Sequence, residues 1–366
     1  MVFLINATNL KNGGGIQVSQ SICGQLINYP QHHFVVMLSS YIDVSIIDFG
    51  SNVELIRYDI KNNFATLIRG RDKYLDTIVC EKKIDAVLTI FGPSRWRPRT
   101  PHLCGFARAQ LLLDSPYNKS LSIKEKIVNR IWGHLFRKCS RHFYTENQYI
   151  SDLLSGYLGD VQVFTVTNYY NQIYDQPSLW KRCHKLPSYS GISCLSVSTH
   201  YPHKNFEIII DIVRYFNVVY PQFKVRFVLT FNESEMPVPI ELRDSFLFIG
   251  KVDVSECPYL YEQSDIMFMP TLLECFTATY PEAMRMEKPI VTTDLDFAHG
   301  ICGDAACYYS AVDAKAAAES IYKVATDKAY SAQLVANGRE RLKKFDNYKQ
   351  RTDKLIKILE EITSEG

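Results

Sequence analysis

The sequence predicts an α/β protein with two doubly wound, Rossmann-like domains in tandem and a helical C-terminal tail. Three observations support this fold class. The chain has 366 residues, which is long for one core and sufficient for two ordinary domains. Short β-branched runs alternate with segments of helical period, a pattern typical of a parallel sheet with helices on both faces. This alternation stops once, between residues 171 and 191, and then restarts.

The first half of the chain contains six apolar runs typical of strands and one clear helix. Apolar residues recur at steps of three and four from Ile123 to Lys138, which predicts the helix. His102 is expected on a further strand that precedes a turn with Arg108. The six strands are predicted over Val2–Ala7, Phe34–Leu38, Val53–Arg57, Asp85–Ile90, Arg141–Thr145 and Val161–Val166.

The second half repeats this organisation after a segment in which Pro, Ser and Gly cluster, as in a linker. We expect a first domain over 1–175, a linker over 176–191 and a second domain over 192–345. A terminal helix over 346–366 is expected to cross back to the first domain. Strands are predicted over Ile192–Ser198, Lys224–Thr230, Ser245–Ile249, Ile266–Met269 and Pro289–Thr293, and helices over Asn205–Val219, Asp313–Thr326 and most of Ser331–Ile362.

Composition excludes several classes of protein. Hydrophobic residues make up 46% and charged residues 22%, as in globular proteins, and the net charge of +2 argues against nucleic acid as a partner. The ten cysteines lack the paired spacings of zinc sites, which predicts reduced thiols in a cytoplasmic protein with no metal. No apolar run approaches the roughly 20 residues of a membrane-spanning helix.

Ligands of doubly wound sheets bind outside the carboxyl ends of the strands, so residues that follow strands are the functional candidates. After the first strand, Gly13, Gly14 and Gly15 open a helix. Glycines allow close backbone approach, and the helix start directs N–H groups at an anion. A flexible turn is the alternative interpretation.

Arginines and a tryptophan follow the fourth strand, at Arg95, Trp96, Arg97 and Arg99. Guanidinium groups bind phosphate in a bidentate manner, and an aromatic ring suits a sugar face. A solvated loop is equally compatible with this pattern.

The predicted helix over Ile123–Lys138 combines its apolar residues with Lys124, Lys126 and Arg130. Such a helix suits an anionic membrane surface, although an ordinary amphipathic helix packed on the sheet is the favoured interpretation.

The second domain places a lysine and two glutamates after strands. Lys204 lies at a loop-to-helix junction, a position that suits a diphosphate. Pro281 suits the first turn of a short helix that Pro289 ends, so Glu274 lies in a loop and Glu282 in the first helical turn. We expect Glu282 to accept from two ribose hydroxyls and Glu274 to meet a sugar; a plain helix-dipole role for Glu282 is the alternative.

These segments resemble a known family. The stretches "NGGG", "PHKN", "FIGKV", "ECFTATYPE", "EAMRMEKPIVTT" and "GDAACYY" occur in order along the chain. Together they resemble the retaining glycosyltransferases of the GT-B fold, specifically family 4, also described as glycosyl transferases group 1. The resemblance implies two Rossmann-like domains that face a cleft, with the acceptor side in the first domain and the nucleotide sugar in the second.

The resemblance also implies roles for individual residues. Lys204 would neutralise the donor diphosphate, Glu282 would hold the ribose, and Glu274 would contact the donor sugar. His102 is the best match to a histidine of the cleft. Further donor contacts would come from Gly14, Gly15, Gly250, Lys251, Phe276, Thr277, Ala278 and Thr279. Independently of the resemblance, the residue types after the strands predict acceptor contacts from Arg95, Trp96, Arg97 and Arg108.

The implied reaction is transfer of a hexosyl unit with retention and without a metal or cofactor, from a UDP or GDP sugar, with dTDP as a further option. The basic, aromatic loop and the basic amphipathic helix suit a membrane-borne, phosphate-linked glycan as the acceptor, such as a lipid-linked intermediate of a bacterial surface polysaccharide (O-antigen or capsule). We expect a cytoplasmic protein that contacts the inner face of the cytoplasmic membrane peripherally, and no nucleic-acid partner.

The sequence departs from the family pattern at two places, and three different functions compete with the one implied. Ser198 and Thr199 stand where many members carry an arginine, and Thr277 replaces a usual glycine. Asp294 and Asp296 would suit Mn²⁺ in a GT-A transferase, which is the first competing function. The second is a GT-B epimerase or phosphorylase, and the third is a non-catalytic sugar-nucleotide binder.

Overall fold

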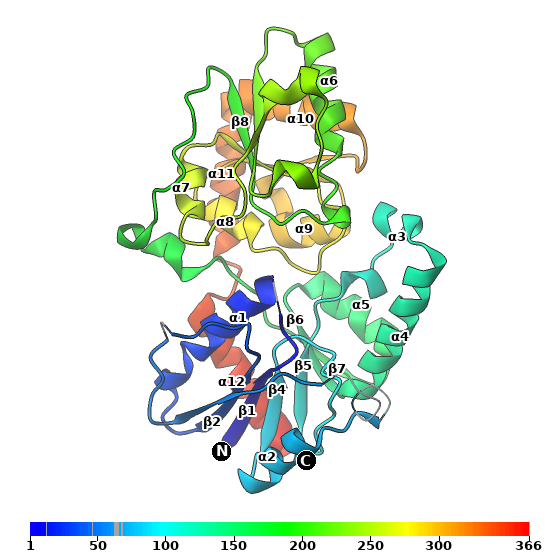
Figure 1. Ribbon diagram of the computed structural model, residues 1–366, viewed down its shortest axis with the longest axis vertical. Coiled ribbons are helices and arrows are strands. Elements are labelled where there is room, and N and C mark those ends of the chain that lie inside the picture. The colour runs from blue at the N-terminus through cyan, green and yellow to red at the C-terminus, as the bar shows by residue number, and fades with distance from the viewer. Residues whose placement is uncertain (12, 46, 62–65, 67–68, 366) are drawn as a thin grey trace. The chain divides into compact units, whose positions relative to one another are not determined.

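The computed structural model describes residues 1–11, 13–45, 47–61, 66 and 69–365, and it divides into two compact units (Figure 1). Unit 1 comprises Met1–Leu112, Leu121–Asn168 and Asp346–Gly366, and unit 2 comprises Leu113–Ser120 and Tyr169–Phe345. The sequence predicted that the first domain ends at residue 175. In the structure, the chain passes from unit 1 to unit 2 after Asn168, and residues 176–191, the predicted linker, lie in unit 2. The C-terminal segment that begins at Asp346 lies in unit 1.

Unit 1 is built on a seven-stranded sheet with the order β3-β2-β1-β4-β5-β6-β7, in which every pair is parallel. The chain goes from β1 to β2 and β3 on one side and then crosses to β4 on the other. The order therefore reverses between β1 and β4, where such sheets bind ligands. The strands are β1 Val2–Ala7, β2 His33–Leu38, β3 Val53–Arg57, β4 Ala86–Thr89, β5 His102–Gly105, β6 His142–Thr145 and β7 Gln162–Thr165.

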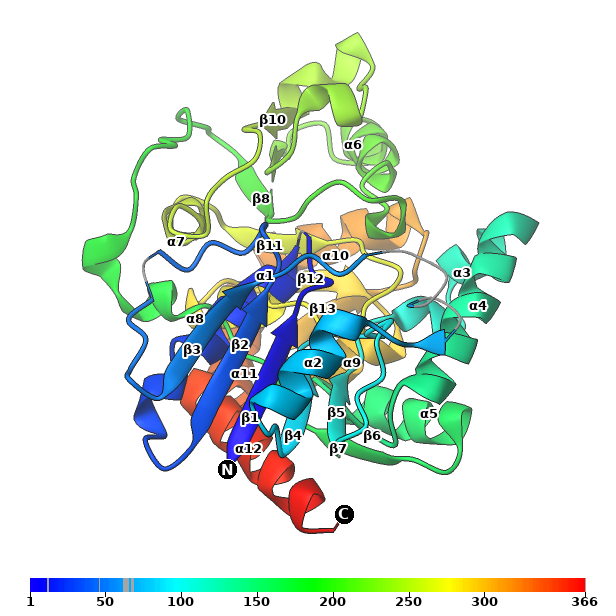
Figure 2. The ribbon, with the colours of Figure 1, turned by 60° about the horizontal axis from the view of Figure 1, so that its bottom comes forward.

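Helices cover both faces of this sheet. Alternate residues of β1 point to opposite sides, so Phe3 and Ile5 belong to a core with α1 and α12, while Leu4 belongs to a core with α2. Figure 2 shows α12 beneath the strands. The helices are α1 Gly14–Cys23, α2 Lys73–Glu81, α4 Ile123–Cys139, α5 Gln148–Leu158 and α12 Tyr348–Ser364.

Side-chain caps fix where several of these helices begin. Ser122 and Glu125 form a capping box at the start of α4, with the Ser122 hydroxyl accepting from the Glu125 amide at 3.3 Å. Asn347 does the same for α12 with Gln350. The capping box explains why α4 begins at Ile123, as the sequence predicted.

Unit 2 is built on a six-stranded sheet with the order β10-β9-β8-β11-β12-β13, again with all pairs parallel. Its order reverses between β8 and β11. The strands are β8 Ile192–Ser196, β9 Val225–Leu229, β10 Phe246–Phe248, β11 Ile266–Met269, β12 Ile290–Thr293 and β13 Ala306–Tyr309. The helices are α3 Pro116–Ser120, α6 Ile208–Val219, α7 Cys257–Glu262, α8 Thr279–Arg285, α9 Asp296–Cys302, α10 Ala314–Thr326 and α11 Lys328–Leu342.

The predicted pair of doubly wound parallel sheets is thus confirmed, with local differences. The helix predicted from Asn205 begins at Ile208, because Pro202–Lys204 form a short 3-10 helix, η6, and Asn205 adopts a left-handed conformation with φ of 54°. Within the described ranges, no helix has both the length and the apolar character needed to cross a membrane.

Candidate active site

Lys204 and Glu274 meet in unit 2, although 70 positions separate them in the sequence. Lys204 ends η6, which follows β8, and Glu274 lies in the loop that follows β11. The Lys204 Nζ donates to Glu274 Oε1 at 2.5 Å, and the two side chains are only 11% and 12% exposed. Since β8 and β11 are adjacent and flank the reversal of strand order, this ion pair occupies the position where such sheets bind ligands.

Hydrogen bonds hold the loop that contains Glu274 against the turn that contains Lys204. The Leu272 amide donates to the His203 carbonyl at 2.8 Å, and the Thr271 hydroxyl lies 3.0 Å from Glu274 Oε1. Glu274 Oε1 therefore accepts from both Thr271 and Lys204. The carboxylate has a fixed place beside the cation, as a ligand-positioning group requires.

Glu282 has a different environment from Glu274. It lies in the first turn of α8 and is 5% exposed, and burial raises the pKa of its carboxyl to about 7. The buried Tyr174 hydroxyl is its polar neighbour and acts in the opposite direction on this pKa. A buried carboxyl of this kind is stabilised as an anion only when hydroxyl or N–H donors reach it.

The rest of the predicted donor loop lies between these two glutamates. Phe276, Thr277 and Ala278 are partly exposed, and Thr279 is buried with its hydroxyl donating to the Val197 carbonyl at 3.2 Å. Among the described residues, those with positive φ do not include Thr277, so its β-branched side chain is placed without backbone strain.

Gly250 and Lys251 follow β10 in the same sheet. Gly250 has a φ of 74°, which requires glycine, and Lys251 is exposed. The backbone conformation therefore explains why a glycine stands at position 250, and the exposed Lys251 side chain is accessible to a ligand.

The positions of the expected arginine carry no replacement cation. His200 is paired with Glu207 at 2.9 Å, and burial lowers the pKa of His203, which favours its neutral form. Ser198 is held by its amide donating to Thr230 Oγ1 at 2.9 Å. Lys204 is the cation of this turn that lies beside a glutamate of the loop.

Asp294, one of the two alternative manganese ligands, is paired with a histidine. Asp294 Oδ1 lies 2.6 Å from His299 Nε2, and Asp296 is the first residue of α9. These are contacts of a strand-end turn, which follows β12.

In unit 1, Gly14 and Gly15 form the first turn of α1, directly after Gly13 at a φ of 74°. A side chain at Gly15 would come within 3.4 Å of Phe91, and Asn9 Nδ2 donates to the Phe91 carbonyl at 2.7 Å. The glycine turn is thus packed against the segment that follows β4, at the reversal between β1 and β4.

His102 was wrongly predicted as a catalytic residue. It lies within β5 and is 5% exposed. Its Nδ1 donates to the Cys139 carbonyl at 3.1 Å, because a carbonyl only accepts, and its Nε2 then accepts from Thr89 Oγ1 at 2.9 Å. Burial lowers the pKa of His102 to about 4, so the ring is a neutral part of the core.

Trp96 was also wrongly predicted, as an acceptor contact. Its side chain is fully buried in the core that includes α2, and its indole N–H donates to Asp76 Oδ1 at 2.9 Å. Arg97 is partly buried and packs so closely on Gly70 that a Cβ there would lie 2.7 Å from its Cδ. Arg95 and Arg108 instead each lie near the ring of Trp132 in α4, a residue that the sequence prediction did not include.

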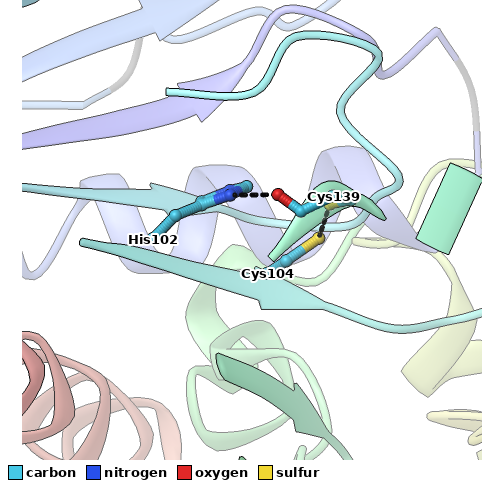
Figure 3. Close-up of side chains that lie close together, drawn as sticks. All are labelled: His102, Cys104 and Cys139. Carbon is cyan, nitrogen blue, oxygen red and sulfur yellow. Dashed lines mark hydrogen bonds between the residues drawn. The ribbon is translucent and has the colours of Figure 1, made fainter. Parts of the chain in front are cut away.

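A second cluster that the sequence did not indicate consists of His102, Cys104 and Cys139, whose possible ligand atoms lie within 4.8 Å of one another (Figure 3). The two sulfur atoms are 3.3 Å apart. Metal binding needs thiolates and a free ring nitrogen. Burial raises the pKa of Cys104 well above its ordinary value, and both nitrogens of His102 are hydrogen-bonded, so we assign no metal to this cluster.

Residues 193–341 match the family model Glycosyl transferases group 1. The matched region lies inside unit 2 and includes Lys204, Glu274 and Glu282. The expected group 1 resemblance is confirmed for this part of the chain. Among curated proteins, the O-antigen chain mannosyltransferase RfbU of Salmonella typhimurium is 26% identical over 161 residues, which span 43% of this chain. The match covers 42% of the length of that relative, less than half of it.

Several solved structures share the fold over nearly the whole chain. Sucrose-phosphate synthase of Thermosynechococcus elongatus has a TM-score of 0.73 at 13% identity and covers 100% of this chain and 99% of its own. WaaG, a glycosyltransferase involved in lipopolysaccharide biosynthesis, has 0.69 at 16% identity, covering 98% and 99%. HepE of Anabaena, in complex with UDP and glucose, has 0.69 at 14% identity, covering 98% and 99%. The expected GT-B fold is confirmed.

Proposed function

We propose that this protein is a metal-independent, retaining glycosyltransferase of family 4. It transfers a hexosyl unit from a nucleoside-diphosphate sugar to a lipid-linked glycan. The observation that carries the proposal is the ion pair of Lys204 and Glu274 at the strand-order reversal of unit 2. The buried Glu282 follows Glu274 by eight positions, and all three residues lie in the region that matches the group 1 model.

The donor site follows from the chemistry of these three side chains. Lys204 supplies a positive charge for the diphosphate and stabilises the negative charge that develops on the departing phosphate. Glu282 is a buried acceptor without an ion-pair partner among the described residues, which suits the two hydroxyls of a ribose. Glu274, fixed by Lys204 and Thr271, is then placed for the hydroxyls of the donor sugar.

Phe276–Thr279 lie between the two glutamates in the sequence, and Phe276, Thr277 and Ala278 are partly exposed residues, which supports a contact of this segment with phosphate oxygens. In transfer with retention, the acceptor hydroxyl would attack the anomeric carbon of the donor sugar from the same face from which the phosphate leaves. The leaving phosphate, held by Lys204, would accept the proton of the acceptor hydroxyl. HepE was solved with UDP and with UDP-glucose, so a UDP sugar is the first donor to test, followed by GDP and dTDP sugars.

The acceptor we propose is an intermediate of a bacterial surface polysaccharide, such as O-antigen or capsule, at the inner face of the cytoplasmic membrane. Support comes from RfbU, an O-antigen chain mannosyltransferase, and from WaaG, which takes part in lipopolysaccharide biosynthesis. Arg95 and Arg108, which follow the adjacent strands β4 and β5, remain the candidate acceptor contacts in unit 1.

A thermal-shift screen with UDP, GDP, dTDP and CDP and their sugars tests the donor. A ligand that binds only the native state raises the melting temperature, and the preferred donor should do so in the wild type but not in Lys204→Ala. The selected donor is then incubated with membrane extract that contains the acceptor. Transfer should persist in a chelator, and NMR of the product should show the anomeric configuration of the donor.

Three results would count against this function. Transfer that is undiminished in Lys204→Ala would remove the proposed role of the ion pair. Conversion of the donor to an epimer without an acceptor would instead support an epimerase. Loss of transfer in the chelator, restored by Mn²⁺, would refute metal independence.

A further inference from the structure

Two arginines share one tryptophan ring in unit 1. The Cζ atoms of Arg108 and Arg95 lie 4.6 and 5.5 Å from the centre of the Trp132 ring. Arg108 Nη2 also donates to Asn129 Oδ1 at 3.2 Å. An indole ring attracts guanidinium groups, so both positive charges are placed beside the same residue of α4.

The charge of Arg108 is not matched by a carboxylate. Among the described residues, its contacts are with the neutral Asn129 side chain and the Trp132 ring, and its Nε is buried without a hydrogen-bond partner. Burial lowers the pKa of Arg108 as it lowers the pKa of Arg95. A half-buried guanidinium without a carboxylate partner is stabilised by an anion that accepts its hydrogen bonds. Phosphate matches the geometry of the guanidinium N–H donors.

The pair lies at the edge of the sheet where ligands bind. Arg95 follows β4 and Arg108 follows β5, which are adjacent parallel strands, so both lie beyond the carboxyl ends. Helix α4 runs in the opposite direction to β5, because its last residue, Cys139, contacts His102 at the amino end of that strand. The N-terminal half of α4 therefore extends toward the carboxyl edge of the sheet.

That half of α4 exposes an apolar row. Ile123, Ile127 and Ile131 recur every four positions and are 79%, 52% and 56% exposed, and Val128 is 39% exposed. Isoleucines at such spacing normally face a core. Contiguous exposed apolar side chains on a helix mark a surface that contacts a protein or a membrane.

The charges around the row favour a membrane. Lys124, Lys126, Arg130, Arg137 and Lys138 on α4 are all exposed, and Glu125 is the single acidic residue of the helix. The whole chain has a net charge of only +2, so positive charge is concentrated on this helix. Exposed isoleucines flanked by basic side chains suit the interface of an anionic bilayer.

We propose that Arg95, Arg108 and Trp132 form a binding site for the phosphate or diphosphate of a lipid-linked acceptor, while the isoleucine row of α4 lies in the surface of an anionic bilayer. This inference rests on the proposed function and specifies the acceptor site. Both parts lie within unit 1, and Trp132 connects them, since it follows Ile131 directly and touches both arginines.

The phosphate site is tested with inorganic pyrophosphate and tryptophan fluorescence. Pyrophosphate also resembles the donor diphosphate, so the titration is done in the Lys204→Ala background. We expect a saturable change in emission that disappears in Trp132→Phe. The double variant Arg95→Ala/Arg108→Ala should bind at least about tenfold more weakly, since hydrogen bonds to charged groups are lost.

Arg99→Ala is the matched control, because Arg99 is an exposed arginine of the same loop. An equal loss of affinity in Arg99→Ala would show binding by net charge alone and would overturn the site. The absence of any Trp132-dependent change in a folded protein, as judged by circular dichroism, would overturn it as well.

The bilayer contact is tested by flotation with vesicles of phosphatidylcholine, with and without phosphatidylglycerol. Wild type should float with the anionic vesicles, and Ile127→Ser/Ile131→Ser should not. Val218→Ser, at a residue 80% exposed on α6 of unit 2, is the control and should float like the wild type. Retention of flotation in the isoleucine variant would overturn the membrane part.

The two sources of phosphate are separated by the arginine variant. If Arg95→Ala/Arg108→Ala still floats but transfers poorly because its KM for the acceptor has risen, the site serves the acceptor, as proposed. If flotation is lost instead with the KM for the acceptor unchanged, the site binds lipid headgroups and the acceptor assignment is wrong. Donor-induced thermal shifts depend on unit 2, so failure of the proposed donor function is recognised separately.

Discussion

Replacement of Glu282 with glutamine has a consequence for stability that depends on pH. Burial raises the pKa of Glu282 from 4.5 to about 7. At about 1.36 kcal/mol for each pKa unit, ionisation of this carboxyl costs the folded state roughly 3 kcal/mol more than the unfolded chain. The folded state holds the proton more tightly, so the stabilising contribution of this carboxyl is fully present below pH 4.5 and is lost as the pH rises toward about 7. Glutamine keeps the shape of the protonated side chain and cannot ionise.

The assay is urea unfolding of wild type and Glu282→Gln at about pH 5 and about pH 8. Relative to wild type, the variant should gain roughly 2 kcal/mol or more in unfolding free energy between these conditions. Glu146 in unit 1 is also buried with a pKa raised to about 7, but it is present in both proteins and cancels in the difference. Glu146→Gln is the matched variant, because it removes a buried carboxyl with a similarly raised pKa from unit 1 instead of unit 2.

A difference between wild type and Glu282→Gln that stays constant from about pH 5 to about pH 8 would refute the reasoning. It would mean that Glu282 keeps its ordinary pKa and is reached by solvent. The same variant should bind the donor more weakly, because a neutral amide accepts less strongly from ribose hydroxyls than a carboxylate. Unchanged donor affinity would remove Glu282 from the donor site and leave its buried environment unexplained by function.

Three further outcomes follow from particular contacts. Glu274→Gln removes the partner of Lys204, so calorimetry should show tighter binding of the free nucleoside diphosphate while transfer is lost; weaker binding would contradict the ion-pair argument. In a thiol titration of the native protein, only the exposed Cys80 and Cys183 should react quickly, with Cys183 slowed because Glu256 raises its pKa; fast reaction of more thiols would contradict the buried positions of the rest. Gly105→Ala places a Cβ 1.9 Å from the Ile90 carbonyl oxygen, so this variant should fail to accumulate as folded protein. A melting temperature near that of wild type would contradict the close approach of Gly105, which ends β5, to Ile90, which follows β4.

The fold could be predicted closely because each strand is a short apolar run bounded by polar residues. The bounds predicted for Val2–Ala7 and Val53–Arg57 are those of β1 and β3. Helix α6 was predicted three positions too early, because the apolar period cannot show that Asn205 turns into the left-handed region. Such a turn depends on the backbone of one residue and leaves no periodic trace.

The site could be predicted where position after a strand decides the role, and not where packing decides it. Lys204 and Glu274 follow adjacent strands and do meet. Trp96 was assigned from its residue type and His102 from its strand and the family resemblance. Trp96 instead packs in a core, and His102 is buried with both ring nitrogens hydrogen-bonded to Thr89 and Cys139. The contact of Arg108 with the Trp132 ring joins segments whose sequence spacing gives no sign that they meet.

The two glutamates of the loop show why spacing alone could not assign their roles. Glu274 is held beside a cation at 2.5 Å, whereas Glu282 is buried with a pKa raised to about 7. A nucleotide sugar carries negative charge on its diphosphate and neutral hydroxyls on its ribose and its sugar. The diphosphate competes with Glu274 for Lys204, so binding of the donor must loosen this ion pair, while ribose hydroxyls supply the donors that a buried Glu282 anion needs. Donor binding at a pH below about 7 is therefore expected to release a proton from Glu282, and affinity should rise with pH as that proton is lost. Calorimetry in buffers of different ionisation enthalpy measures the released proton, and its absence in wild type would place the ribose elsewhere.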